Sequence, residues 1–467
     1  MRNTTNRILY GLSFALILSW SPTLRAEEAA PTSLPTPAVT MAPAPTVEAK
    51  PVVSSKFAAE LYGFVEFDSI HDSTESFNDL AGNGIIARGN YAAGHQRTIF
   101  SVRNSRLGFK LKGPDTEMLK TSAIVEMDFL GNQPSPVSEA GFVTSPTFRI
   151  RHFALKLDTP FVNILLGQYW QLFGWQSTFH PNTVEMQGVP GQIYSRSPQI
   201  RLSHVFASQP VNVEVAVAAV RPAQRDSSIP DGQAGLRVIL NDWKGLHTAG
   251  STGTAIDGAS VGVSGVVRHF ELPDSAAATA SAKTKNGSGI SVDALIPVIP
   301  ATPESKGNSL TLTGSFVRGT GIADLYTGLS GGLGAPTPPS TGSSTATYSA
   351  NVDSGLVAFD NAGNLHTINW LSYMAGFQYY LPPSGRVWLS GNFSSMKSTN
   401  LASFATPATP STASKVFDRS LWADGNLFVD LNKAVRLGAE LAWFRQTYGD
   451  GVKVHNYRGQ FSAFYIF

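Results

Sequence analysis

The sequence YRGQFSAFYIF, Tyr457–Phe467, decides the fold that this chain is expected to adopt. Its apolar and aromatic side chains recur with a period of two and would share one face of a strand: Tyr457, Phe461, Ala463, Tyr465 and Phe467. A strand this apolar aggregates in water if its edge is left open. We therefore predict that it is paired on both sides, in a sheet that closes on itself and turns an apolar face to lipid.

The end of the chain carries a second signal. The last residue is Phe467, and another aromatic residue, Tyr465, stands two positions before it. This ending resembles the C-terminal assembly signal of bacterial outer-membrane β-barrels. Two earlier segments, 371–381 and 434–444, also alternate apolar side chains with Ser, Gly, Gln, Arg or Glu. An apolar outside and a polar inside are the reverse of a soluble barrel, whose interior is packed with side chains.

From Phe57 onward the sequence repeats a rhythm of strand, long connection, strand and short turn. Strands in one direction are expected to begin near residues 60, 119, 162, 211, 259, 309, 386 and 434, and the returning strands near 97, 147, 199, 233, 287, 366, 417 and 454. This pattern predicts an all-β fold, a transmembrane antiparallel β-barrel of about 16 strands, with short periplasmic turns and long outer loops. Counts of 14 or 18 stay open, because Ile290–Ile296 is a weak strand and the Gly245–Gly258 turn is long.

Aromatic residues near the predicted strand ends are interpreted as the girdles that such barrels place at the two membrane surfaces. They are Tyr62, Trp170, Trp243, Trp388, Trp422 and Trp443.

Composition agrees with a barrel and divides the chain into three parts. The mean hydropathy is -0.03, as expected when lipid-facing and lumen-facing residues alternate. Residues 1–26 have the charged start, apolar centre and small-residue exit of a secretory signal peptide. Residues 27–56 are rich in Pro, Ala and Thr and predict an extended periplasmic linker or, as the alternative, a partner-binding segment. Residues 57–467 remain for the barrel.

The sequence contains no motif for several classes of function. The sequence has no cysteine, which excludes disulfides, thiolate metal sites and cysteine catalysis. Without the predicted signal peptide, acidic and basic residues nearly balance, so nucleic acid is not an expected partner. The glycine-rich run Gly328–Gly334 is not followed by a helix, and neither His152 nor the pair Ser203-His204 lies in a nucleophile motif. We expect no enzyme activity, no metal and no cofactor.

Residues 162–206 hold the connection that is expected to shape the function. Two strand-like ends frame roughly 28 residues that contain proline, glycine, aromatic residues, His180, Glu185 and Arg196. A structureless loop of this length is improbable in a compact domain unless it is functional or disordered, and its composition argues against disorder. We predict that this third loop folds into the barrel lumen and constricts a pore.

The alternation of the strands places many charged side chains in the lumen. The acidic ones are Glu66, Asp68, Glu126, Asp128, Asp424 and Glu440, and the basic ones are Arg106, Arg201, Arg237, Arg268, Arg436 and Arg458. Arg149 and Arg151 join them if a bulge keeps Phe153 and Leu155 outside. A wall of arginine favours anions, and the guanidinium fork matches carboxylate or phosphate. The alternative is that these arginines pair with the acids and only satisfy a polar wall.

Four short motifs in the first half carry a resemblance to a known family. They are LYGFV at Leu61–Val65, SRLGF at Ser105–Phe109, RIRHF at Arg149–Phe153 and LGQYW at Leu166–Trp170. Together with Val184-Glu185 and Gln199-Ile200-Arg201, they resemble the DcaP-like outer-membrane porins. The resemblance implies a sixteen-stranded trimeric porin with a basic constriction for small anions such as dicarboxylates, and it carries over Arg106, Arg149, Arg151 and Arg201. The Pro/Ala linker, which has no heptads, departs from the helical arm of some members.

The expected function is passive diffusion of small, preferentially anionic solutes across the bacterial outer membrane, in contact with its lipid. The candidate constriction residues are Arg106, Arg149, Arg151, Arg201, Glu185, Arg196 and His180. Glu185 argues against a strict anion preference, and His180 has no second ligand at the spacing of a metal site. Two alternatives stay open: a phosphate-type anion porin, because phosphate-selective porins are similar at LYG and SRLG, and a structural or adhesive barrel with Ser/Thr/Pro-rich loops at 335–347 and 405–414.

Overall fold

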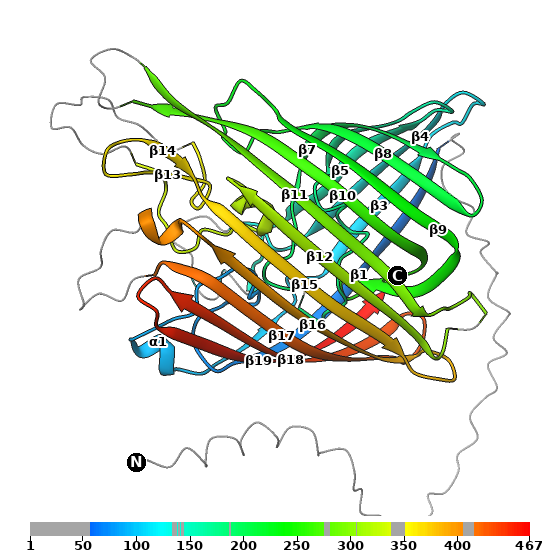
Figure 1. Cartoon of the computed structure of the whole chain (residues 1–467). Helices are drawn as coiled ribbons and strands as arrows, with labels where there is room; N and C mark the ends of the chain where they lie inside the picture. The colour runs from blue at the N-terminus through cyan, green and yellow to red at the C-terminus, as the bar shows by residue number, and fades with distance from the viewer. Residues whose placement is uncertain are drawn as a thin grey trace, which may run out of the picture. The chain divides into compact units, whose positions relative to one another are not determined.

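The strands of this chain form a closed antiparallel β-barrel of sixteen strands (Figure 1). The computed structural model describes residues 57–132, 138, 141, 144–185, 188–274, 281–304, 306–337, 351–404 and 415–467. The predicted signal peptide, the predicted linker, the loop 405–414 and most of the loop 335–347 lie outside the described residues, so the expectations for them stay predictions.

Seventeen strand segments make up the barrel wall: β1 Ala58–Asp72, β2 Arg97–Ser101, β3 Arg106–Lys112, β4 Lys120–Asp128, β5 Arg149–Asp158, β6 Asn163–Trp170, β7 Arg196–Phe206, β8 Val211–Val220, β9 Asp231–Ala249, β10 Gly253–Pro273, β11 Ala282–Ile299, β12 Ser309–Thr320, β15 Asn369–Tyr380, β16 Val387–Ser398, β17 Phe417–Asp430, β18 Val435–Tyr448 and β19 Lys453–Ile466. The connections carry the smaller elements α1 Tyr91–Gly94, η1 Ala323–Tyr326, η2 Leu401–Phe404, β13 Val357–Phe359 and β14 Leu365–Thr367.

The barrel closes where its first and last strands meet. β1 pairs on one side with β19 and on the other with both β2 and β3, which together form one interrupted strand. The terminal Phe467 exchanges two backbone hydrogen bonds with Gly63, at 3.0 and 3.1 Å. The last strand therefore has no open edge, and the predictions of sixteen strands and of a paired terminal strand are confirmed.

The predicted strand starts agree with the observed ones, with one part of the chain as an exception. The segment Ile290–Ile296, which the sequence marks only as a weak strand, is the middle of the long strand β11. The predicted turn Gly245–Gly258 is wrong, because β9 continues to Ala249 and β10 already begins at Gly253. The register slips at Gly258/Ala259, and beyond this bulge residues 245–248 of the hairpin tip are buried, whereas residues 253–255 are exposed.

The outer wall is apolar and the inner wall is polar, as the alternation predicts. On β18, for example, Leu441 is 76% exposed, whereas its neighbours Glu440 and Ala442 are 2% and 6% exposed. A belt of exposed apolar side chains this large is stable only in contact with lipid. The protein is therefore located in the bacterial outer membrane. Among the described residues, no helix is long and apolar enough to cross a membrane.

The interpretation of these aromatic residues as interfacial girdles is wrong for four of them. Tyr62 points inward, where its hydroxyl donates to Glu126 at 2.9 Å. Trp170, Trp388 and Trp422 are only 7%, 1% and 1% exposed and point into the barrel. Trp388 and Trp422 share strand parity with inward polar residues, so the face of each could have been derived from the alternation. Trp243, which is 41% exposed, lies on the outside as predicted.

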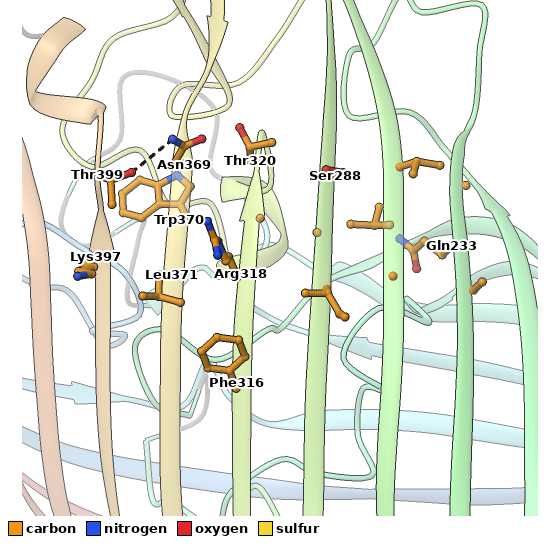
Figure 2. A pocket seen from close by; sticks show the side chains of 18 of the residues that line it. Gln233, Ser288, Phe316, Arg318, Thr320, Asn369, Trp370, Leu371, Lys397 and Thr399 are labelled. Carbon is orange, nitrogen blue, oxygen red and sulfur yellow. Dashed lines mark hydrogen bonds between the residues drawn. The ribbon is translucent and has the colours of Figure 1, made fainter.

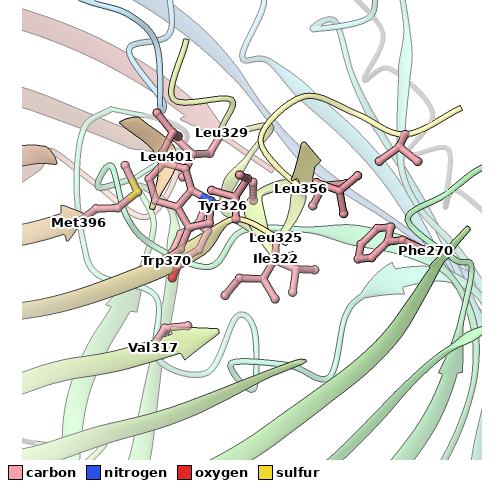
Figure 3. Packing of buried hydrophobic residues seen from close by; sticks show 14 of the residues in the cluster. Phe270, Val317, Ile322, Leu325, Tyr326, Leu329, Leu356, Trp370, Met396 and Leu401 are labelled. Carbon is pink, nitrogen blue, oxygen red and sulfur yellow. The ribbon is translucent and has the colours of Figure 1, made fainter. Parts of the chain in front are cut away.

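Connections on the loop side of the barrel are packed rather than extended. A cluster of buried apolar residues around η1 joins three connections to the inner wall (Figure 3), with Leu325, Tyr326, Leu329, Trp370 and Leu401 at 0–2% exposure. Ser372 of β15, a residue of the lumen face, donates a 3.1 Å hydrogen bond to the Tyr326 hydroxyl. These contacts bring the connection between β12 and β15 against the loop that follows β6, since Tyr194 N donates to the carbonyl of Leu325 at 2.9 Å.

Candidate site in the barrel lumen

The connection between β6 and β7, residues 171–195, is buried over nearly its whole described length. It begins beside β6 and first contacts the inner face of β9 and β10, where Phe173 N donates to Gln233 and Gly174 N donates to Ser264. The indole of Trp175 also donates to the carbonyl of Val263 at 3.1 Å. The loop is thus tied by its backbone to strands that are distant from its own.

Two glycines of the wall allow this close approach. A Cβ at Gly235 would lie 2.8 Å from the Trp175 ring, and a Cβ at Gly262 would lie 2.6 Å from it. Since real Cβ atoms do not come so near to a rigid indole, the absence of a side chain at these positions is what lets Trp175 lie against the sheet.

The middle of the same loop contacts the opposite strands. Asn182 receives hydrogen bonds from Trp388, Ser390 and Asn392 of β16, each at 3.0 Å. Further along, the backbone N–H groups of Val184 and Glu185 both donate to one carboxylate oxygen of Glu440 on β18, again at 3.0 Å. These two bonds to a buried carboxyl group hold the loop in one position.

A group of charged side chains from β3, β4, β5 and β7 lies where the loop returns to the wall. We call it the basic cluster: Arg106, Glu126, Asp128, Arg149, Arg151 and Arg196. The register between β4 and β5 shifts at Glu126/Met127, so that Arg151 and His152 both point inward and are 1% and 4% exposed. This is the bulge that the sequence required to keep Phe153 outside, where it is 56% exposed.

Two of the four arginines in the basic cluster are matched by the two acids. Arg149 binds Asp128 through two nitrogens, at 2.9 and 2.6 Å. Arg151 binds Glu126 at 2.6 Å and also reaches Asp128 at 3.1 Å. Arg106 stands further off, with its Nε 3.8 Å from Glu126. The pairs satisfy Glu126 and Asp128, and the positive charges of Arg106 and Arg196 exceed them.

Arg196 is held by aromatic rings. Its guanidinium carbon lies 4.7 Å from the ring centre of Trp170 and 5.2 Å from that of Tyr194, and its buried Nη1 has no hydrogen-bond partner among the described residues. Stacking on aromatic faces stabilises a guanidinium without neutralising it. A buried nitrogen with an unused N–H is a donor that an anion can take up.

The pKa of the Tyr194 phenol, on the loop, reflects the positive electrostatic potential of the basic cluster. Burial alone would raise the pKa of its phenol, but the guanidinium groups of Arg151, Arg196, Arg106 and Arg149 outweigh it and lower the pKa to about 7. A phenol gains this much acidity only where the surroundings stabilise a negative charge.

His180 packs against the same rings. It stacks on Tyr194 at 5.3 Å and meets the edge of Trp170 at 4.9 Å. Burial, followed by the charge of Arg196, lowers its pKa to about 3, so the imidazole is neutral at physiological pH. The ring accepts a hydrogen bond from Ser177 N at 3.3 Å. Its role is to support the aromatic side of the basic cluster, not to add charge.

Glu185 is not part of the basic cluster. It lies beside β19 and β1 in a second group, in which the guanidinium of Arg458 bridges Glu185 at 2.6 Å and Asp72 at 2.8 Å. All three side chains are at most 1% exposed. Burial raises the pKa of Glu185 to about 7, although Arg458 opposes this. Other acids of this acidic region are the buried Glu66, Asp68, Asp79 and Glu440 and the half-buried Asp424.

This pKa predicts a pH-dependent stability. A folded-state pKa of about 7 against an ordinary value of 4.5 means that the folded protein holds a proton on Glu185 more tightly than the unfolded chain. The resulting stabilisation is complete below about pH 4.5 and is lost as the pH rises through 7. In Glu185→Gln this contribution should be absent. The difference in unfolding free energy between the two proteins should change by up to about 3 kcal/mol over that range.

Urea unfolding of both proteins in detergent micelles at several pH values measures this difference. Titration of the groups that do not interact with Glu185 cancels in the comparison, because both proteins share them. Parallel pH profiles for the unaltered protein and Glu185→Gln would contradict the assignment.

Arg201 is inward but also lies apart from the basic cluster. It donates to Gln199 at 3.0 Å and to the carbonyl of Trp170, on the side of the ring stack toward the turns. The structure thus brings together five of the seven predicted residues, Arg106, Arg149, Arg151, Arg196 and His180, and separates Arg201 and Glu185 from them.

Sequence reasoning missed the part played by the β9–β10 hairpin tip. Gly250 N donates to the carbonyl of Pro181 at 2.9 Å, and Asn182 donates to the carbonyl of Gly250 at 2.7 Å. On the other side, Thr248 N donates to Gln378 of β15. The hairpin tip therefore supports the loop from the turn end of the lumen. In the sequence, only the unusual length of the predicted turn indicated that the hairpin tip has a role in the lumen.

The part of the chain that the structure describes contains no group of three or more His, Cys, Asp or Glu side chains arranged to hold a metal ion. The basic cluster instead combines four arginines, two carboxylates and aromatic rings, with one unused donor on Arg196.

Comparison with protein-family models and with curated proteins gives no match, whereas solved structures do match. The outer membrane channel DcaP of Acinetobacter baumannii is 16% identical, with 88% of this chain and 97% of that chain covered at a TM-score of 0.62. An anion-selective porin from Comamonas acidovorans is 13% identical, with 88% and 100% covered at a TM-score of 0.50. These similarities show that the chain has the fold of outer-membrane porins, and they confirm at the level of the fold the resemblance to DcaP-like porins.

Proposed function

We propose that this protein is an outer-membrane porin that passes small anions through a lumen narrowed by residues 171–195. The observation that carries the proposal is the basic cluster: four arginines stand against two acids, and Arg196 keeps an unused donor. The porin fold supports the general function, and the charge of the cluster supports the preference for anions.

Solvent reaches part of this cluster. The side chains of Arg149 and Arg106 are 29% and 18% exposed, although both are on the lumen face. The more deeply buried Arg151, at 2%, holds the acids in place. We infer that Arg149, Arg106 and Arg196 present positive charge to the passage, while Arg151 is structural.

The acidic region of Glu185, Asp72 and Glu440 is reached by the same loop. A passage between a basic and an acidic wall carries a transverse electric field, which orients a solute that has charge at one end. The acids are buried and paired with Arg458 or with backbone N–H groups, so the exposed charge along the passage is mainly positive. This favours anions over cations in spite of Glu185.

Dicarboxylates are the proposed substrates, on the resemblance to DcaP-like porins, with phosphate as the second candidate. A planar guanidinium matches a carboxylate by two parallel hydrogen bonds, and Arg196 and Arg106 could each take one carboxylate. Binding has to be weak, because a tightly held solute would block the passage. The same resemblance proposes a homotrimer, which cross-linking in native membranes would test.

Single-channel recording in a planar bilayer tests the proposal and compares the substrates. We expect stepwise conductance, with current noise that rises when succinate is added and rises less with phosphate at the same charge concentration. A reversed order would replace dicarboxylate by phosphate as the substrate class. A folded, inserted protein that gives no conductance would reject the porin in favour of a structural or adhesive barrel.

A further inference from the structure

We propose that the outer wall of the barrel binds the phosphorylated headgroup of an outer-leaflet lipid at Arg318 and Lys397, with an acyl chain in the groove below them. This site lies on the opposite face of the wall from the basic cluster and is independent of the proposed anion selectivity. The register of β12, β15 and β16 places its two cations. Leu371 is paired directly with Arg318 on one side and with Lys397 on the other.

Both cations point outward. Arg318 and Lys397 alternate with the buried residues Val317, Met396 and Ser398, and the exposed Phe316 shares the outer face with Arg318. Two strand spacings of about 4.8 Å separate the two backbones, a distance that long Arg and Lys side chains span toward one phosphate. Within the described residues, neither cation has a carboxylate at ion-pair distance, and Arg419, paired with Lys397 in the register, extends the row.

A groove continues from the cations along the wall. Its volume is about 1060 Å³, and the residues that line it include Arg318, Lys397, Phe316, Val267 and Ile290. The last three are 44%, 63% and 47% exposed, so the lower part of the groove is an apolar surface open to lipid. A volume of this order is at the upper end of the ~300–1,000 Å³ of small-molecule sites.

Figure 2 shows the groove in layers along the strands. Asn369, Thr320 and Thr399 lie toward the loops, with Asn369 donating to Thr399 at 3.3 Å. Arg318 and Lys397 form the next layer, and Phe316 lies further toward the turns. From the loops toward the turns, the groove thus presents hydroxyl and amide groups, then positive charge, then an apolar surface. A phosphorylated glycolipid has its sugar, phosphate and acyl chain in the same order.

The depth of the cations agrees with such a headgroup. β12 ends at Thr320 and β15 begins at Asn369, so Arg318 lies within two residues of the loop-side end of the wall. Long loops mark the outer face of a barrel of this kind, which places the row at the surface of the outer leaflet. Basic pockets at the headgroup level bind anionic lipids, because the phosphate brings its charge to them without leaving the interface.

The test uses the full chain in dodecylmaltoside micelles, with bisphosphorylated lipid A and the same lipid without its phosphates as probes. Native mass spectrometry measures the apparent affinity of each. The unaltered protein should bind the phosphorylated lipid at least about tenfold more tightly than the dephosphorylated one. Equal binding of the two lipids overturns the proposal, and this comparison needs no variant.

Two double variants locate the site. Arg318→Gln/Lys397→Gln should lose about tenfold in affinity for the phosphorylated lipid. The matched control Lys112→Gln/Lys120→Gln removes two exposed cations at the turn end of the barrel and should bind as the unaltered protein does. Equal losses of affinity in both double variants would mean that the lipid is attracted by any surface cation, and would overturn the assignment. Displacement of the lipid by millimolar inorganic phosphate would do the same, because a lipid site needs the acyl chain.

Discussion

The double variant Arg106→Gln/Arg196→Gln is expected to take up dicarboxylates about tenfold more slowly than the unaltered protein. The two substitutions remove the positive charges that exceed the acids of the basic cluster, while the pairs of Arg149 with Asp128 and of Arg151 with Glu126 stay intact. Each unit charge contributes about 1 kcal/mol at ~4 Å in water, and 1.4 kcal/mol corresponds to a factor of ten. Swelling of liposomes in succinate solution measures the rate.

Two controls make this result specific. The uptake of an uncharged sugar of similar size should be unchanged, because glutamine leaves the width of the passage nearly the same. Arg445→Gln, which removes a charge stacked on Trp443 of the outer wall, should leave succinate uptake unaffected. If the double variant slows sugar and succinate equally, the effect is steric and the electrostatic role of the cluster is rejected.

Replacing Arg149 and Arg151 would test the same idea less cleanly. Arg151 is buried and binds Glu126 and Asp128, so its removal leaves carboxylates without partners in the wall. The loss of stability would then accompany any loss of selectivity. The structure therefore moves the test to Arg106 and Arg196, because Asp128 and Glu126 keep their close partners Arg149 and Arg151 when these two arginines are replaced.

Arg458→Ala is expected to lower the free energy of unfolding by about 3–5 kcal/mol, the usual cost of removing one partner of a buried ion pair. Arg458 is the common partner of Asp72 and Glu185, and all three side chains are buried. Without it, Asp72 keeps a hydrogen bond from Asn456 at 2.8 Å, whereas Glu185 can regain stability only by taking up a proton. Urea unfolding at neutral pH measures the loss.

The partial rescue by protonation gives this prediction a second readout. The deficit of Arg458→Ala should be largest at alkaline pH and should shrink as the pH falls toward 7, because loss of Arg458 raises the pKa of Glu185 further and its carboxyl then takes up a proton. Arg445→Ala, on the outer wall, should stay within about 0.5 kcal/mol of the unaltered protein. A loss of less than 1 kcal/mol for Arg458→Ala at neutral pH would show that the loop is not held by this ion pair.

The strands could be predicted because the period of two is a local property of the sequence. The same alternation even required the bulge at Arg151, since Arg149, Arg151 and the outward Phe153 cannot share one regular strand. Trp388 and Trp422 lie near strand ends, as girdle residues do, but their parity along the strand is that of the inward residues. In each of these cases the information lay within a few residues.

The arrangement of the site could not be predicted in the same way. Glu185 and Arg458 are 273 residues apart, and the contact between them depends on where the loop crosses the lumen. That course is set by contacts such as Trp175 on Gly235 and Asn182 on β16. The sequence around each of these residues does not indicate which distant residue it contacts. The sequence therefore identified the charged residues, but it could not separate the basic cluster from the acidic region.

The most direct test of the central claim is the reversal potential of the unaltered protein in a planar bilayer under a potassium chloride gradient. The positive charge of the half-buried Arg106, Arg149 and Arg196 predicts a potential biased toward chloride, which moves toward zero as salt rises and screens the cluster. A bias toward potassium would contradict the account, because the passage would then be governed by the acidic region around Glu185 and Glu440.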